Sequence, residues 1–122
     1  MKTIFTCGTF DMCHEGHLRL LREMKERGIV IVFLYDDASS FKVKGHRTFY
    51  DYKTREQMLM NTGLPNAIIK VETEDPTENF IEFKNGIEIH NFLYICGDDK
   101  FGSLGLEYLR NVGIKIKYIN SK

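Results

Sequence analysis

One segment of the chain, Ile29–Tyr35, is apolar at every position and consists of β-branched, aliphatic and aromatic residues. A run without a polar face is typical of a β-strand that is covered on both sides. It is far too short to cross a bilayer, which takes about 20 apolar residues in a helix. A strand covered on both faces belongs in a mainly parallel sheet between layers of helices, so the segment favours an α/β fold.

Strand-like and helix-like segments alternate along the chain. The apolar spacing from Leu18 to Met24 predicts a helix that ends at Gly28, a residue favoured just after a helix. Asp36–Tyr50 is predicted to be a polar loop. Further strands are predicted at 3–7, 67–71, 91–96 and 114–119, and further helices at 51–60, 80–87 and 104–110. The order predicts one domain over residues 1–122, built on a mainly parallel five-stranded sheet between two helical layers.

Charge and composition exclude several classes of protein. The chain has 17 basic and 17 acidic residues, so its formal net charge is +0, which argues against nucleic acid as the main partner. The sequence shows no membrane span and no apolar leader, so we expect a cytoplasmic protein without a membrane partner. Cys7, Cys13 and Cys96 have no CxxC spacing and are expected to be reduced thiols.

Polar segments follow three of the predicted strands. They are Gly8–Asp11, Asp36–Asp37 and Gly97–Asp99. Open parallel sheets bind ligands beyond the carboxyl ends of their strands, so the three segments are expected to converge on one site.

The first of these segments leads into a helix that carries two histidines. His14 and His17 are three residues apart and share a face of the first turn, and Gly16 allows a ligand to approach the backbone. A helix N-terminus favours an anion, and imidazoles donate hydrogen bonds to phosphate oxygens. This pattern predicts a phosphate-binding site. Two alternatives stay open: ordinary surface histidines, or a zinc site that also uses Cys7 and Cys13.

Arg55 lies on the same helical stripe as Tyr52 and Leu59 and is predicted to point inward. A buried cation needs a fixed anionic partner. The partner is either a carboxylate, Asp36 or Asp37, or the phosphate of a ligand, and the residues alone leave this choice open.

The string Gly-Thr-Phe-Asp-x-x-His-x-Gly-His at residues 8–17 resembles the HxGH family of cytidylyltransferases. The resemblance implies a Rossmann-like three-layer fold and a cytosolic homodimer. It implies transfer of CMP from CTP to a small phosphorylated alcohol similar to glycerol 3-phosphate, with release of pyrophosphate and with Mg²⁺ as cofactor.

The resemblance also implies roles for individual residues. His14, His17, Lys44 and Arg55 would be the catalytic, phosphate-binding residues. Asp11 would approach the metal or organise the start of the helix. The residues expected to border the nucleotide are Gly8, Thr9, Phe10, Gly16, Gly97, Asp98 and Asp99.

Two other functions are compatible with the residues. One is transfer of an adenylyl group from ATP to another phosphate ester, because the base-reading residues are weakly defined. The other is a non-catalytic nucleotide-binding module, because the family's Gly-Ile-Ser segment is not found after Tyr118.

Overall fold

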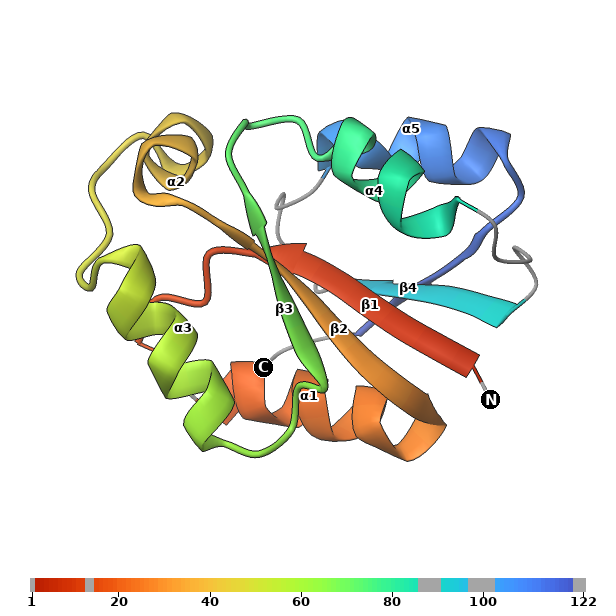
Figure 1. The fold of residues 1–122 in the computed structure, drawn as a ribbon, viewed down its shortest axis with the longest axis horizontal. Helices are drawn as coiled ribbons and strands as arrows, with labels where there is room; N and C mark the ends of the chain where they lie inside the picture. The colour runs from red at the N-terminus through yellow and green to blue at the C-terminus, as the bar shows by residue number, and fades with distance from the viewer. Residues whose placement is uncertain (1, 13–14, 86–90, 97–102, 120–122) are drawn as a thin grey trace.

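A computed structural model describes residues 2–12, 15–85, 91–96 and 103–119. Within these residues five strands and five α-helices follow one another (Figure 1). The strands are β1 (Lys2–Gly8), β2 (Gly28–Tyr35), β3 (Ala67–Val71), β4 (Phe92–Cys96) and β5 (Lys115–Tyr118). The helices are α1 (Glu15–Arg27), α2 (Asp37–Lys44), α3 (Tyr52–Asn61), α4 (Thr77–Lys84) and α5 (Ser103–Asn111). Strand and helix alternate except between β2 and β3, where two helices come in succession.

The strands form one sheet in the order β3-β2-β1-β4-β5, and every neighbouring pair is parallel. Helices α1 and α3 lie on one side of this sheet, and α2, α4 and α5 lie on the other (Figure 1). The predicted three-layer α/β/α architecture is therefore confirmed.

The two faces of the sheet bury different kinds of side chain. The face toward α4 and α5 is aromatic: Phe5 contacts Tyr94 at a ring-centroid distance of 4.9 Å, and Phe33 meets Phe80 edge-on at 5.0 Å. The opposite face is mainly aliphatic, with Val32 and Leu34 among the residues packed with α1. Successive β2 side chains enter alternate cores, and each fully buried one contributes about 1.5–3 kcal/mol. This explains why the 29–35 segment is apolar throughout.

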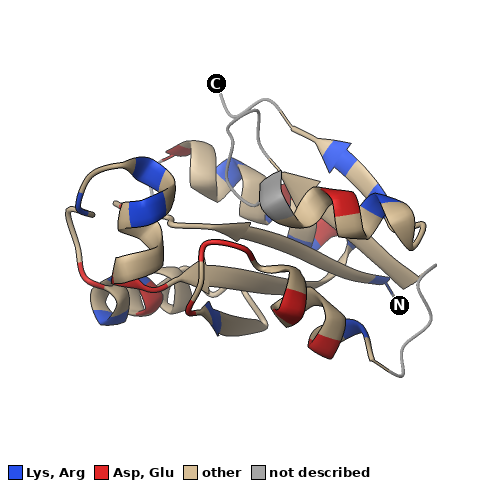
Figure 2. Ribbon diagram, turned by 90° about the horizontal axis from the view of Figure 1, so that it is seen from above, with Lys and Arg blue, Asp and Glu red and all other residues tan. Residues whose placement is uncertain are grey.

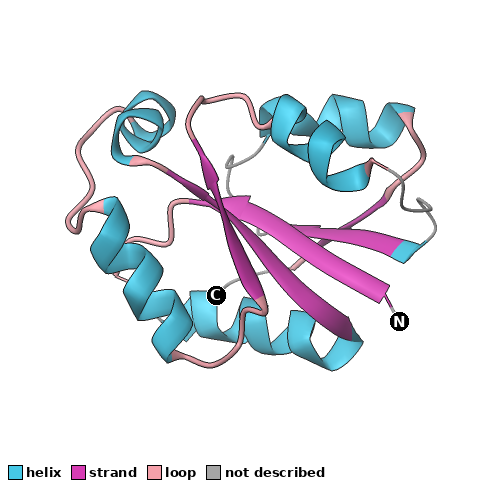
Figure 3. Ribbon diagram, in the orientation of Figure 1, coloured by secondary structure: helices cyan, strands magenta, loops and turns pink. Residues whose placement is uncertain are grey.

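The prediction of a loop over Asp36–Tyr50 is wrong for its first half, which forms α2 (Figure 3). The Asp36 side chain caps the helix by accepting a hydrogen bond from the backbone N–H of Ser39 at 2.8 Å. Gly45 ends it in the left-handed conformation, with φ of 82°. The buried residues of α2 are Ser39 and Ser40, so the helix has no apolar stripe for a periodicity argument to detect.

Gly28 is needed for a reason other than the predicted helix end. It is the first residue of β2, and its φ angle is not positive, so it does not adopt the left-handed conformation of a glycine that ends a helix. A Cβ atom at this position would lie 2.2 Å from the Lys2 carbonyl oxygen, so glycine allows the first residues of β1 and β2 to approach each other. The predicted 80–87 helix begins earlier, at Thr77, and Ile87 lies outside the described residues.

The described part of the chain contains no helix with the length and apolar character that a membrane span requires. Basic and acidic residues are interspersed along the ribbon (Figure 2).

Candidate active site

The sheet order reverses at β1, so a ligand site is expected beside the carboxyl end of this strand. From β1 the chain builds outward through β2 and β3 on one side and through β4 and β5 on the other. Open α/β sheets bind ligands at such a reversal, outside the carboxyl ends of the strands. Gly8 ends β1 at this point. Gly97, Asp98 and Asp99, which follow β4 and were predicted to border the nucleotide, lie outside the described residues.

The turn from β1 to α1 has an unusual backbone. Phe10 and Met12 have φ values of 51° and 62°, in the left-handed region that costs a side-chain-bearing residue about 1–2 kcal/mol. Phe10 is buried, and a Cβ at Gly8 would lie 3.0 Å from its ring. Strained backbone of this kind persists only where the surroundings fix it, and it is concentrated at functional sites.

His17 lies in the first turn of α1, directly after the buried Gly16. Its ring packs against the Phe10 ring at a centroid distance of 4.8 Å. The turn therefore fixes one of the two predicted histidines at a helix N-terminus, where the positive end of the helix dipole favours an anion. His14 lies outside the described residues, so its pairing with His17 stays a prediction.

Thr9 is fully buried and is connected to α2. Its hydroxyl donates to the Ser40 hydroxyl oxygen at 3.2 Å. The hydroxyl-bearing face of α2 thus packs against the β1–α1 turn. Contact of Thr9 with a nucleotide stays a prediction, since the structure shows its side chain bonded within the protein.

Arg55 is the largest fully buried side chain among the described residues. Its Nη2 donates to Asp37 Oδ1 at 2.8 Å, and Nη1 donates to the carbonyls of Thr9 and Tyr35 at 2.8 and 3.0 Å. Its Nε donates to the Tyr50 carbonyl at 3.1 Å. Of the two partners that the sequence left open, the structure shows the carboxylate, Asp37, and it shows the guanidinium bonded to protein acceptors.

Asp11 is bonded to the segment that precedes α3. Its Oδ2 accepts from the backbone N–H of Phe49 at 2.6 Å and its Oδ1 from that of Tyr50 at 3.0 Å. Within the described ranges no group of three or more His, Cys, Asp or Glu side chains is placed to hold a metal. Mg²⁺ as cofactor and the metal role of Asp11 therefore stay predictions.

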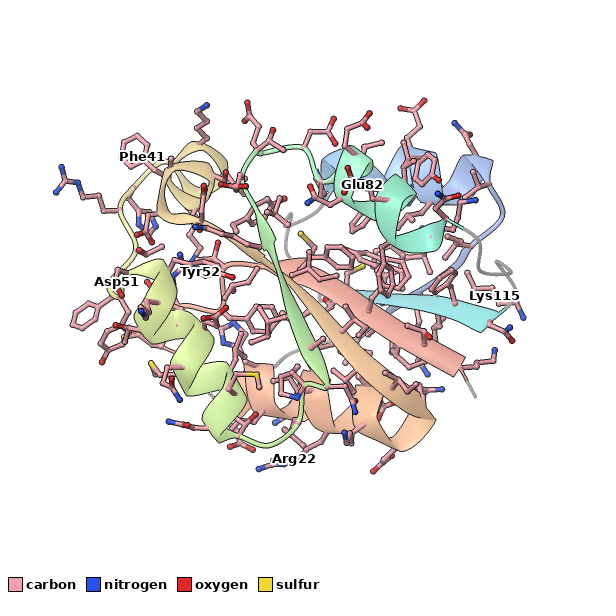
Figure 4. All side chains as sticks on the ribbon, viewed as in Figure 1. Arg22, Phe41, Asp51, Tyr52, Glu82 and Lys115 are labelled. Carbon is pink, nitrogen blue, oxygen red and sulfur yellow. The ribbon has the colours of Figure 1, made fainter. Side chains whose placement is uncertain are left out.

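Lys44 is the last residue of α2 and is half-buried. Beyond it an open groove of about 450 Å³ lies between α2 and the start of α3. Phe41 and Asp51, labelled in Figure 4, belong to α2 and the α3 N-cap respectively. The groove is lined by Asp37, Ala38, Phe41, Arg47, Thr48 and Asp51.

Two residues near this edge have raised pKa values. Burial raises the pKa of the Cys7 thiol to about 12, against a weaker opposing effect of a hydrogen bond with Tyr35. Burial, followed by the charge of Glu56, raises the pKa of Tyr52 to about 12. Cys7 belongs to the aromatic core. Cys13 and His14, which the zinc alternative also uses, lie outside the described residues, so that alternative stays open.

The sequence profile of the cytidylyltransferase-like family matches residues 5–120, and the chain belongs to this family. Among curated relatives, glycerol-3-phosphate cytidylyltransferase of Staphylococcus aureus is 31% identical over 84 residues, which cover 66% of this chain and 64% of the relative. The Bacillus subtilis protein of the same name is 30% identical over 81% of this chain and 73% of its own length. The bifunctional protein HldE of Helicobacter pylori is 32% identical over 77% of this chain but only 21% of its own length.

Solved structures share the fold. A lipopolysaccharide core biosynthesis protein from Thermoplasma volcanium superposes with a TM-score of 0.74 and 24% identity, over 98% of this chain and 95% of that one. A protein of unknown function from Archaeoglobus fulgidus gives a TM-score of 0.68 and 18% identity, over 99% of this chain and 90% of that one. These similarities confirm the Rossmann-like fold.

Sequence reasoning did not predict the contacts of Ser40, Phe49 and Tyr50 with predicted site residues. Ser40 bonds to Thr9, and the backbone of Phe49 and Tyr50 bonds to Asp11. The N-cap Asp36 followed by Gly45 is a sequence signal that would have found α2 and hence Ser40. The loop contacts have no such signal, because they use backbone groups that every residue carries.

Proposed function

We propose that this protein is a nucleotidyltransferase that transfers CMP from CTP to a small phosphorylated alcohol and releases pyrophosphate. The observation that carries the proposal is the β1–α1 turn of a chain that belongs to the cytidylyltransferase-like family. There two strained positions, Phe10 and Met12, lie on either side of Asp11 in the turn before α1, and His17 lies in the first turn of that helix. Relatives named glycerol-3-phosphate cytidylyltransferase support a polyol phosphate as the acceptor.

The reaction joins a phosphate oxygen of the acceptor to the α-phosphorus of CTP, and the bond from that phosphorus to the departing pyrophosphate breaks. A phosphate monoester has a second pKa of about 6 and is largely ionised at pH 7, so it attacks without a general base. The protein has to align two anions and stabilise the charge on the α-phosphate and pyrophosphate. In the proposed mechanism His14 and His17 donate hydrogen bonds to these oxygens, and Lys44 adds a positive charge.

Magnesium is part of the proposal as a partner of the nucleotide. Mg²⁺ is usually bound through one or two carboxylates together with substrate phosphates. Because the described residues provide no ready-made metal cluster, we expect any Mg²⁺ requirement to follow the triphosphate. Titration with a chelator, with and without nucleotide, measures whether the protein holds Mg²⁺ by itself. Binding of Mg²⁺ to the nucleotide-free protein would contradict the expectation that the metal arrives with the triphosphate.

The direct test is pyrophosphate release by the purified chain, with CTP or ATP and a panel of phosphate esters that includes glycerol 3-phosphate. Release that depends on CTP and a polyol phosphate supports the proposal. Release with ATP alone favours adenylyl transfer. Tight nucleotide binding without release over the whole panel favours a nucleotide-binding module. His17→Ala is the matched inactive variant.

We also propose that the protein is a homodimer located in the cytoplasm, as the resemblance to the family implies. Light scattering on the purified protein measures the mass directly. A mass of 14.3 kDa, that of one chain, would contradict the dimer.

A further inference from the structure

The contacts of Tyr50 suggest a role for Asp11 and Arg55 that differs from the one the family resemblance implied. Residues 45–51, here called the 45–51 loop, connect α2 to α3. Within this loop Tyr50 is held at both of its backbone polar groups. Its N–H donates to Asp11 Oδ1 at 3.0 Å, and its carbonyl accepts from Arg55 Nε at 3.1 Å. The neighbouring Phe49 N–H donates to the other Asp11 oxygen at 2.6 Å.

Arg55 also bonds to the ends of two strands. Nη1 donates to the carbonyls of Thr9, directly after β1, and Tyr35, the last residue of β2. With Nε on Tyr50 and Nη2 on Asp37, at least four of the five guanidinium N–H groups are used within the protein. An arginine that grips a phosphate in the bidentate way needs two N–H groups side by side. The observed bonds leave Arg55 at most one.

The carboxylate of Asp11 is engaged in the same way. Each of its oxygens accepts one backbone N–H from the 45–51 loop. Such bonds to a charged acceptor are worth about 1.5–3 kcal/mol each. Both oxygens of Asp11 are thus directed at the backbone of the loop. Asp11 and Arg55 therefore both bind the backbone of the 45–51 loop and hold it against the β1–α1 turn.

We propose that Asp11 and Arg55 are positioning residues that fix the 45–51 loop against the β1–α1 turn, and that neither binds a phosphate or a metal ion. The consequence for catalysis rests on the proposed function. Lys44 immediately precedes the loop and His17 follows the turn, so loss of either anchor shifts the two proposed phosphate-binding groups relative to each other.

Backbone amide hydrogen exchange tests the structural part without any substrate. The variants are Asp11→Asn, which replaces one acceptor oxygen by a donor, and Arg55→Lys, which keeps the charge but not the four bonds. We expect the amides of Phe49 and Tyr50 to exchange at least about tenfold faster in both variants. The matched control is Arg27→Lys, since Arg27 is also paired with a carboxylate, Glu23, but far from the loop. Unchanged exchange in Asp11→Asn would overturn the proposal.

Steady-state kinetics separate positioning from direct contact. Positioning predicts that both variants lower kcat about ten- to hundredfold, with the KM for CTP and the half-saturating Mg²⁺ concentration unchanged. A raised Mg²⁺ requirement in Asp11→Asn, or a raised KM for CTP in Arg55→Lys, would overturn it for that residue. If Arg55→Lys does not fold, Asp11→Asn alone decides the result. If the unmodified protein shows no turnover, the proposed function fails while hydrogen exchange still decides this inference.

Discussion

Polar side chains are used differently at the two ends of the sheet. Near the amino ends of the strands they keep contact with solvent. The Asn66 carboxamide accepts from Lys25 Nζ at 3.0 Å at the surface, and Arg27 forms an ion pair with Glu23 in which both side chains are about one-third exposed. At the carboxyl ends, Thr9 and Arg55 are fully buried. Polar groups are usually buried at such a cost only where every hydrogen bond is made.

The volume of open space does not distinguish the two ends. The groove beside α2 measures about 450 Å³, and a groove of about 500 Å³ lies at the amino ends, lined by Lys2, Lys25, Glu26, Arg27, Gly28, Ile29 and Asn66. What differs is the buried hydrogen bonding and the strained backbone at Phe10 and Met12. The comparison shows that buried hydrogen bonding and strained backbone, rather than the size of a groove, mark the candidate site.

The largest expected effect separates the two arginines. Arg55→Ala should lower the free energy of unfolding by about 3–5 kcal/mol, because it leaves the buried carbonyls of Thr9 and Tyr35 without their donor and removes a fully buried side chain. Arg27→Ala, at the amino end, should cost at most about 1 kcal/mol. Urea unfolding of both variants measures the difference. Equal losses would remove the energetic distinction between the two ends.

The next effect concerns activity alone. His17→Ala should lower turnover by about 10²-fold or more, the loss seen when one preorganised donor is removed from a transition state. Because His17 is half-buried at a helix start, the fold should persist, with unchanged far-UV circular dichroism. Full turnover in this variant would remove His17 from the mechanism.

A pH effect is expected from Cys7, near the carboxyl end of β1. Its folded pKa of about 12 exceeds the ordinary value of 9.0, so above pH 9 the unfolded thiol loses its proton while the folded one keeps it. Stability from this group is complete below pH 9 and falls as the pH rises toward 12, by about 1 kcal/mol between pH 9 and 10. Comparing unfolding of the unmodified protein with Cys7→Ala at these two pH values isolates the contribution. Identical slopes would contradict it.

The smallest effect tests the strained turn. Met12→Gly removes a left-handed side-chain penalty of about 1–2 kcal/mol but adds unfolded-state entropy of about 0.5–1 kcal/mol, so it should be neutral or slightly stabilising. Met60→Gly is the control, because Met60 is similarly exposed but helical, and this variant should lose about 1 kcal/mol. Thermal unfolding of the two variants measures both changes in stability. A clear loss in Met12→Gly would indicate that the Met12 side chain makes a stabilising contact.

Much of the fold could be predicted from local patterns. The strand over Ala67–Val71 was predicted with the bounds that the structure has, and the buried strand over 29–35 differs by one residue. The inward direction of Arg55 was also confirmed. Helix α2 was not predicted, since it buries serines where the prediction relied on apolar periodicity. In the candidate site, His17 was located at its helix start, but the contacts of Asp11 with the 45–51 loop were not foreseen.

The amino-acid sequence by itself determined the alternation of strands and helices, the apolar strand covered on both faces, and the histidine-bearing segment after the first strand. Only the tertiary structure decided which partner Arg55 takes and what Asp11 holds. The physical reason is the separation along the sequence: periodicity and capping act over a few residues, whereas these bonds join a charged side chain to backbone groups up to 46 positions away. Such groups are the same in every residue, so only the folded chain selects which of them meet.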